Sequence, residues 1–192
     1  MSRAGLPMGF QVTGRLFGDA TVLRWEAVDL PPPGPGEVQL RQTFVGLNYI
    51  DVYQRTGLYP VGDMPAVLGM EAAGVVEQLG PEVTGLSVGD RVAYAGLPVG
   101  AYAESRCIPA DRLVKVPDTV TLEEAAAMML QGMTARYLLK GCFHVDPTTT
   151  ILLHAAAGGV GRCVRRADGV LHPRGARVRR PRDPDPGAGA QP

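Results

Sequence analysis

The sequence predicts a mixed α and β chain in which a β-rich domain precedes the first βα unit of a parallel sheet. Short apolar runs between residues 21 and 116 are separated by glycines and prolines, a pattern typical of a barrel or a sandwich. From residue 121 the pattern becomes helical, and the apolar run 151–154 then leads into a glycine turn. With 192 residues, of which 45% are apolar, the chain has room for one full domain and part of another.

The strands expected in the first domain are short and interrupted. Thr21–Val28 alternates loosely between apolar and polar residues, the segment PPPGPGE breaks the run, and Val38, Leu40 and Phe44 resume it. Ile50–Arg55 is expected to form a short helix. Further strands are predicted over residues 71–79, 90–95, 101–108 and 113–116.

A helix is predicted to begin at residue 121. Thr121 and Glu124 fit the T-x-x-E capping box, in which two side chains satisfy backbone N–H groups at a helix start. The run EEAAAMML that follows is rich in strong helix formers, and MTARYLLK continues or restarts the helix before Gly141. The change from the β-rich domain to the next one is therefore expected close to this helix.

The segment ILLHAAAGGVG is the strongest single motif. Ile151–His154 is expected to be a buried strand, with His154 as a core histidine. On the dinucleotide-binding pattern G-x-G-x-x-G, Ala156 replaces the first glycine, while Gly158 and Gly161 occupy the other two positions. Free backbone N–H groups at the start of the next helix could hold phosphates. Taken alone, the motif leaves a simple packing turn equally open.

Charge and cysteine content restrict the function classes. Residues 1–161 hold 11 basic and 16 acidic residues, whereas residues 162–192 hold 8 arginines and 3 aspartates. The cysteines, Cys107, Cys142 and Cys163, form no C-x-x-C pair, so neither a zinc cluster nor a disulfide framework is expected. No secretory signal and no apolar stretch of membrane-spanning length is expected, and the predicted location is cytoplasmic.

Several motifs occur in one order along the chain: GLNYIDVYQRTGLYP, VLGMEAAGVVEQLGPEVTGLSVGDRVAY, GAYAE, LQGMTARYLL and HAAAGGVG. Together they closely resemble the zinc-independent, zeta-crystallin-like quinone oxidoreductases of the medium-chain dehydrogenase/reductase superfamily, over residues 8–161. The resemblance implies a GroES-like β-barrel catalytic domain followed by an incomplete Rossmann nucleotide-binding domain. The expected boundaries are 1–125 for the first domain and 126–161 for the start of the second.

The resemblance also implies which residues form the site. The catalytic residues are expected to be Asn48, Asp51, Tyr53 and Tyr59. NADPH is the expected cofactor, and the residues expected to bind it are Asn48, Gln131, Thr134, Ala156, Ala157, Gly158, Gly159, Val160 and Gly161. Without the resemblance, the tyrosines would be interpreted as ordinary parts of a barrel wall, and Gln131 and Thr134 as solvent-facing residues.

The same segments argue against a metal site. Zinc alcohol dehydrogenases of this superfamily carry a G-H-E segment whose histidine binds the catalytic zinc, and here the segment is Gly69-Met70-Glu71. Methionine is a poor zinc ligand compared with thiolate, imidazole or carboxylate, and residues 81–106 contain no cysteine. A metal-free reaction is expected, and an electrophilic quinone suits it because hydride transfer then needs mainly orientation and a proton. Glu71 and Asp90 are interpreted as structural or surface carboxylates.

Residues 162–192 are expected to form an Arg/Pro-rich, disordered tail that departs from the family pattern. Val160, Val164 and Ala167 permit about two helical turns, and a proline downstream blocks further helix. We expect a chain truncated in its Rossmann domain, with a frameshift or alternative splicing as the origin of the tail. Reading the coding DNA in its other frames tests the frameshift. Nucleic-acid binding is not expected, because no aromatic side chains interleave with the arginines.

Functions of different classes remain open. The first is NADPH-dependent hydride transfer, without zinc, to a quinone or a conjugated carbonyl compound. The second is a catalytically inactive, truncated or frameshifted isoform that acts as a binding module or is degraded. An enoyl-thioester reductase shares the scaffold, but the segment LNYIDVYQRTGLYP argues against it by resemblance. A small-molecule substrate is the expected partner, no membrane is expected, and family members often form homodimers.

Overall fold

The computed structural model describes residues 8–13, 22–27, 29–62, 65–146 and 149–166. The chain divides into two compact units, Met1–Leu130 and Gln131–Pro192. Within the described ranges, no helix combines the length and the apolar character that crossing a membrane requires.

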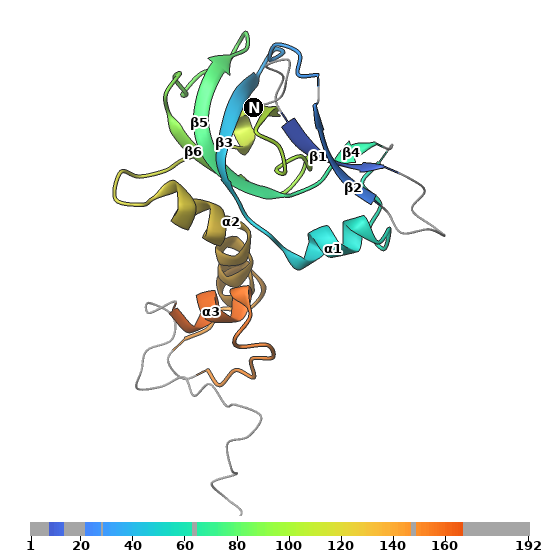
Figure 1. Ribbon diagram of the computed structural model, residues 1–192. Helices are drawn as coiled ribbons and strands as arrows, with labels where there is room; N and C mark the ends of the chain where they lie inside the picture. Colours follow the sequence, from blue (N-terminus) through green and yellow to red (C-terminus); the bar gives the residue numbers. More distant parts are fainter. Residues whose placement is uncertain (1–7, 14–21, 28, 63–64, 147–148, 167–192) are drawn as a thin grey trace, which may run out of the picture. The chain divides into compact units, whose positions relative to one another are not determined.

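The first unit is built on a five-stranded antiparallel sheet (Figure 1). Its strands are β3 (Glu37–Val45), β5 (Glu71–Leu79), β6 (Arg91–Ala95), β7 (Ser105–Pro109) and β8 (Val114–Lys115). They are ordered β7-β3-β5-β6-β8, so the two long strands, β3 and β5, lie side by side near the middle. A short helix, α1 (Tyr49–Arg55), follows β3, and a 3-10 turn at Ala110–Arg112 connects β7 to β8.

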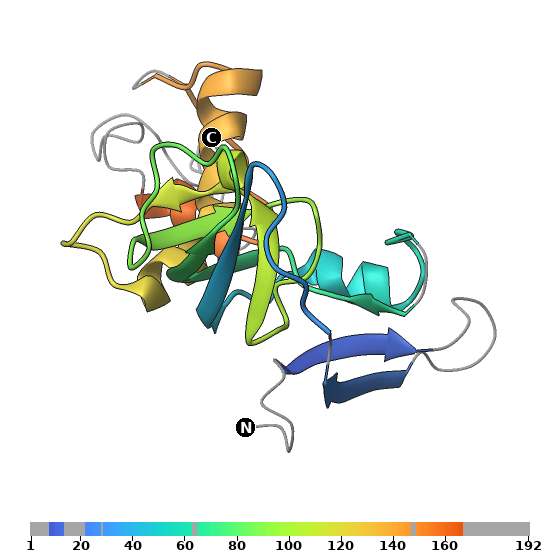
Figure 2. The same cartoon turned by 90° about the horizontal axis from the view of Figure 1, so that it is seen from above.

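A smaller sheet in the same unit has the order β2-β1-β4. It contains β1 (Met8–Thr13), β2 (Val22–Ala27) and β4 (Ala66–Val67). Figure 2 shows β1 and β2 as neighbouring antiparallel strands. The sequence predicted β2 but neither β1 nor β4, because a two-residue strand and a strand that contains a glycine carry little periodic signal.

The core of the first unit lies between apolar residues that alternate along the larger sheet. Val38 and Leu40 on β3 are fully buried, together with Ala72, Val76, Val92, Tyr94, Ala101 and Ile108 from the rest of the unit. The strand-like run predicted from Val38 through Phe44 is confirmed as β3, although Phe44 near its end is 40% exposed. A register irregularity between Gln42 and Phe44 changes the pairing of β3 with β5, and a bulge of this kind moves the following side chains to the other face.

The strands predicted at 71–79, 90–95 and 113–116 are confirmed within a residue or two, as is the short helix. The strand predicted over 101–108 begins only at Ser105. The residues before it form a loop instead, since the Gln42 side-chain amide donates hydrogen bonds to the carbonyls of Ala101, at 3.0 Å, and Ala103, at 2.7 Å. These bonds occupy backbone groups that a strand would use for pairing.

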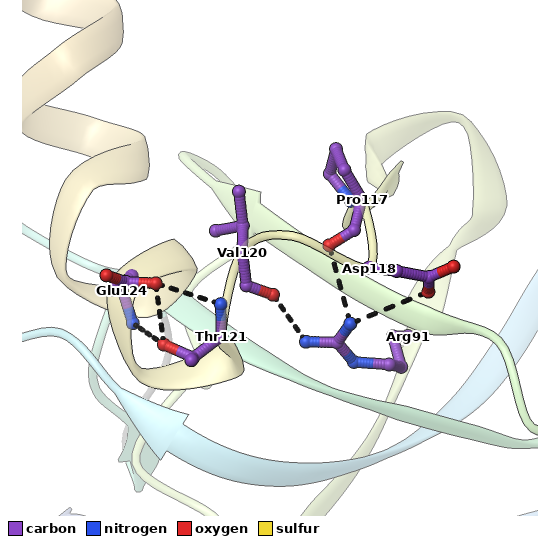
Figure 3. Close-up of polar contacts among 6 residues, drawn as sticks. All are labelled: Arg91, Pro117, Asp118, Val120, Thr121 and Glu124. Atoms are coloured by element: carbon purple, nitrogen blue, oxygen red, sulfur yellow. Dashed lines mark hydrogen bonds and ion pairs between the residues drawn. The ribbon is translucent and has the colours of Figure 1, made fainter.

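Figure 3 shows how the next helix, α2 (Leu122–Arg136), begins. The Glu124 N–H donates to Thr121 Oγ1 at 3.1 Å, and the Thr121 N–H donates to Glu124 Oε2 at 2.9 Å. The predicted capping box is therefore confirmed. Beside it, the guanidinium of Arg91 on β6 donates to the carbonyls of Val120, at 2.6 Å, and Pro117, at 3.4 Å. These bonds attach the chain just before α2 to the larger sheet.

The second unit contains the end of α2, a π-helical turn at Tyr137–Cys142 and α3 (Gly159–Arg166). Its small apolar cluster is formed by Ala135, Leu139, Val145 and Val164. The helix predicted after the glycine turn is confirmed. The strand predicted at 151–154 is wrong, because no strand is found in the second unit's described residues, 131–146 and 149–166, and His154 is exposed. Residues 167–192, which include most of the predicted tail, lie outside the described residues.

Candidate functional site

A buried polar face of α1 forms the centre of the candidate site. Asn48 immediately precedes the helix, and Asp51 and Gln54 follow at intervals of three residues, so all three lie on one face. Their exposed fractions are 9%, 3% and 4%. Polar side chains are seldom so deeply buried unless hydrogen bonds satisfy them. The apolar residues of α1 are all more exposed than these three, which reverses the usual arrangement of a surface helix.

Asn48 is held by a carboxylate from the larger sheet. Glu71 is the first residue of β5 and has an exposed fraction of 0%. The Asn48 side-chain N–H donates to Glu71 Oε2 at 2.7 Å, and the backbone N–H of Leu130 donates to Glu71 Oε1 at 2.7 Å. Each carboxylate oxygen therefore has its own donor. Glu71 thus joins three segments of the first unit, which confirms its interpretation as a structural carboxylate.

Asp51 continues this network. Its Oδ2 accepts the Asn48 backbone N–H at 2.8 Å and the Tyr102 hydroxyl at 2.7 Å. The Gln54 side-chain N–H donates to the sulfur of Met70 at 3.3 Å. Two buried atoms, Asp51 Oδ1 and Gln54 Oε1, have no hydrogen-bond partner among the described residues. Unsatisfied acceptors at such depth are rare in folded proteins.

Burial changes the acid–base properties of this cluster. Removal from water raises the pKa of Glu71, and the negative charge of Asp51 acts in the same direction, while the hydrogen bonds from Asn48 and Leu130 oppose the rise. The pKa of Tyr102 is also raised, mainly by burial and further by its hydrogen bond to Asp51. Tyr102 therefore remains a hydrogen-bond donor at all ordinary pH values.

The exposed side of α1 carries a run of tyrosine rings. Tyr53 and Tyr59 pack edge to face, with ring centroids 5.5 Å apart at an angle of 71°. Tyr49 packs against Tyr53 in the same manner, at 5.1 Å and 77°. The structure therefore brings the two predicted tyrosines together and adds Tyr49, which sequence reasoning missed. The i, i+4 spacing of Tyr49 and Tyr53 on a helix was the available signal.

An apolar cavity of about 490 Å³ lies in the same unit, within the size range of small-molecule sites. Leu23 and Trp25 of β2, Val45 at the end of β3 and Leu47 contribute apolar walls, and Tyr102 also lines it. Tyr102 joins the cavity to the polar cluster, because its hydroxyl reaches Asp51. The sequence did not predict this cavity, whose walls come from segments far apart along the chain.

The glycine turn lies in the second unit. Ala155 adopts a positive φ of 51°, and its carbonyl accepts the Gly158 N–H at 2.8 Å. A side chain at Gly161 would place its Cβ 2.6 Å from the Ala155 oxygen, so only glycine fits there. A side chain at Gly159 would overlap the amide of Gln131. The turn is therefore as tight as a dinucleotide-binding turn requires at its last glycine.

The remaining predicted cofactor residues are placed around this turn or on the helix before it. Gln131 lies against Gly159, and Thr134, also on α2, is half-buried. Ala156 and Val160 are half-buried, whereas Ala157 and Gly158 are exposed. Among the residues that the structure describes, no group of three or more His, Cys, Asp or Glu side chains could hold a metal ion. Met70, at the zinc-ligand position of the superfamily, instead accepts the bond from Gln54.

Comparison with known proteins agrees with this architecture. Residues 34–118 match the family model described as the alcohol dehydrogenase GroES-like domain. This range contains the larger sheet, α1 and every member of the buried polar cluster except Leu130.

Two curated relatives extend the match beyond that domain. A quinone oxidoreductase of Pseudomonas aeruginosa is 49% identical over 145 residues, which are 76% of this chain and 45% of the relative. A 2-haloacrylate reductase of Burkholderia is 49% identical over 142 residues, covering 71% of this chain and 43% of the relative. The chain thus spans a little less than half the length of these relatives.

A solved structure shows the same relationship in three dimensions. The quinone oxidoreductase of Escherichia coli complexed with NADPH is 37% identical to the chain, with a TM-score of 0.79. The match covers 90% of this chain and 51% of the other. Since the domain match, the sequence identity and the fold agree, the chain belongs to the medium-chain dehydrogenase/reductase superfamily, and it is similar to quinone oxidoreductases of that superfamily over about half of their length.

Proposed function

We propose that this protein reduces a quinone or a related conjugated carbonyl compound with NADPH. In the balanced reaction, the cofactor supplies a hydride and the solvent a proton, and a quinone becomes a hydroquinone while NADPH becomes NADP⁺. The 2-haloacrylate reductase relative widens the substrate class, because its name specifies a carbon–carbon double bond conjugated to a carboxylate.

The glycine turn carries this proposal. At Gly161 the backbone of Ala155 and Ala156 approaches so closely that no side chain fits, and helix α3 begins two residues earlier at Gly159. N–H groups at the start of a helix attract phosphate through hydrogen bonds and the helix dipole. We assign the pyrophosphate of NADPH to residues 156–161, and Gln131 and Thr134 to the same cofactor site.

The substrate side belongs to the first unit. Asn48 would contact the nicotinamide or its ribose, and Asp51 would hold Asn48 and Tyr102 in place through its Oδ2. Tyr53 and Tyr59 offer an aromatic wall with hydroxyl groups at its edge, which suits a flat ring that carries oxygen atoms. The reaction needs no metal at Met70, because a quinone accepts a hydride without prior activation of its carbonyl by a Lewis acid.

A binding titration and an assay on the purified chain test the proposal. NADPH is titrated by calorimetry, and its oxidation is followed with and without a simple benzoquinone. Saturable binding with quinone-dependent oxidation supports the proposal. A Gly161→Val variant is expected to lose at least tenfold in NADPH affinity, because its side chain fills the turn. Gly132→Val serves as the control, since a side chain at that helical position of α2 meets open space.

The non-catalytic alternative gives a different result in the same experiment. A folded chain that neither binds NADPH nor oxidises it would contradict the proposed activity of this chain and leave the binding-module interpretation. If the chain binds NADPH but does not oxidise it, the proposed cofactor site is supported and the proposed reaction is contradicted. Circular dichroism on each sample separates both results from a failure to fold.

A further inference from the structure

Glu71 occupies a space that the fold keeps free for it. A side chain at Gly46 would overlap Glu71 Oε2 and would place its Cβ 2.7 Å from the Ala126 carbonyl oxygen. The Gly46 N–H also donates to the Glu71 backbone carbonyl at 2.9 Å. The absence of a side chain at Gly46 therefore lets the carboxylate lie between β3, α2 and the start of α1, where both of its oxygens find donors.

Burial of this carboxylate is costly and is not compensated by a cation. None of the ion pairs between described residues includes Glu71. Loss of hydration disfavours the ionised form, and burial accordingly raises the pKa of Glu71. An apolar residue of similar size would fill the space without this cost. The carboxylate is therefore expected to act on its neighbours in a way that an apolar residue could not.

The two ends of the Asn48 amide are chemically different, and Glu71 distinguishes them. An ionised carboxylate only accepts hydrogen bonds, so the NH2 end of Asn48 has to face Oε2 at 2.7 Å. The second oxygen, Oε1, is occupied by the Leu130 backbone N–H, which is fixed in α2. With both oxygens occupied, the Asn48 amide has one favourable orientation, in which Oδ1 lies on the side away from Glu71 and toward the backbone N–H of Asp51 at the start of α1. An amide oxygen has two lone pairs, so Oδ1 can accept a further donor in this orientation.

We infer that Glu71 is a positioning residue of the cofactor site: it fixes the Asn48 amide so that its oxygen, not its NH2 group, is presented to a bound ligand. This inference rests on the proposed function, which assigns Asn48 to the nicotinamide side. A presented oxygen selects hydrogen-bond donors, such as a ribose hydroxyl or the carboxamide NH2 of nicotinamide. Glu71 itself does not touch the cofactor.

The variant Glu71→Gln tests the inference because it changes an acceptor into a donor without changing size. The carbonyl oxygen of the new glutamine can accept from the Leu130 N–H, and its NH2 group then faces Asn48, whose amide has to turn over. We expect NADPH affinity to fall about tenfold, the factor that corresponds to one lost hydrogen bond. The matched control is Glu77→Gln in the same strand, where the carboxylate pairs with the exposed Arg41 and the affinity is expected to stay unchanged.

A rescue variant separates positioning from a general structural effect. In the double variant Asn48→Asp/Glu71→Gln, the NH2 group of the new glutamine donates to one oxygen of the new aspartate, and the other oxygen is again presented to the ligand. We expect NADPH affinity to return to within about threefold of the original chain. In Asn48→Ala, the further change Glu71→Gln should have no additional effect. Additive losses, or no rescue, would overturn the inference.

A second measurement decides the inference independently of NADPH binding. In NMR spectra of the free chain, one Nδ2 proton of Asn48 is expected to be shifted downfield and protected from solvent exchange. Glu71→Gln should abolish both features, whereas Glu77→Gln should preserve them. If the chain does not bind NADPH, the proposed function fails and this measurement still tests the role of Glu71. Unprotected Asn48 amide protons in the original chain would overturn the inference, even where the variant does not fold.

Discussion

Similar apolar segments adopt different structures in the two compact units. In the first unit, β3 has a hydrogen-bonded strand on each side, and Leu40 at its centre is fully buried. In the second unit, the apolar segment 151–153 pairs with no strand among the described residues, and Leu152 is 70% exposed. Its neighbours Ile151 and Leu153 are only partly buried against the small cluster of that unit.

This difference shows what an apolar run can and cannot specify. A strand needs a partner strand for its backbone hydrogen bonds, so its formation depends on residues elsewhere in the chain. A helix satisfies most of its own backbone groups, and accordingly α2 and α3 both form where the sequence predicts them. The described residues of the second unit therefore form local helices without the sheet that would bury them in a complete nucleotide-binding domain.

The largest effect is expected from removing a core side chain in the first unit. Leu40→Ala should reduce the free energy of unfolding by about 3 kcal/mol, through lost burial and an unfilled cavity. The matched substitution Leu152→Ala, in the second unit, should change it by less than about 0.5 kcal/mol. Urea denaturation, followed by hydrogen exchange of the amides in β3 and β5, provides the measurement. Equal losses in the two variants would contradict the contrast between the units.

A smaller effect is expected at the connection between the larger sheet and α2. Arg91→Ala leaves the Val120 and Pro117 carbonyls without their donor (Figure 3) and should cost about 2 kcal/mol. Arg112→Ala provides the control, because that side chain is 59% exposed and pairs with its neighbour Asp111 at 3.7 Å. Hydrogen exchange should accelerate in the first turn of α2 in Arg91→Ala only. Unchanged protection in that turn would refute the proposed attachment.

Loss of the helix cap should cost less again. Thr121→Ala removes the acceptor of the Glu124 N–H and should lower the free energy of unfolding by about 1 kcal/mol. The hydrogen bonds from Thr121 also lower the pKa of Glu124, so the variant should move that pKa back up. NMR titration of the Glu124 side chain measures this change. Thr84→Ala, at an exposed position of a surface loop, should alter neither quantity.

The smallest effect concerns pH. Burial raises the pKa of Glu71 above its ordinary value of 4.5, so the folded chain binds a proton more tightly than the unfolded chain. Stability is therefore highest below the unfolded value and declines as pH rises from about 4.5 through the raised pKa. Denaturation curves between about pH 4 and pH 8 measure the decline, which Glu71→Gln should lack. A steeper decline in the variant than in the original chain would reverse the predicted sign.

Much of the fold was predictable because its signals are local. The capping box at Thr121 and Glu124 involves residues three apart, and glycines and prolines separate the strands of the first unit. The wrong predictions have non-local causes: the strand expected over 101–108 begins late because the Gln42 side chain of β3 binds carbonyls before Ser105, and the missing strand at 151–154 lacks a partner among the described residues. Neither cause can be recognised from the residue pattern of a single segment.

The candidate site was predictable in its parts but not in its connections. Family motifs gave Asn48, Asp51, Tyr53 and Tyr59, and the structure brings them together around α1. The roles of Glu71 and Tyr102 were not visible, since they lie 23 and 51 residues from their hydrogen-bond partners at α1. Their interpretation as site residues needed distances between segments that only meet when the sheet forms.

The sequence by itself determined the helix starts, the tight glycine turn and the family, because each rests on residue types at short, fixed spacing. Only the tertiary structure decided which carboxylate is buried, which end of the Asn48 amide faces it and which apolar run becomes a strand. Those outcomes depend on the free energy of groups removed from water, and burial is a property of the packed chain, not of any one segment.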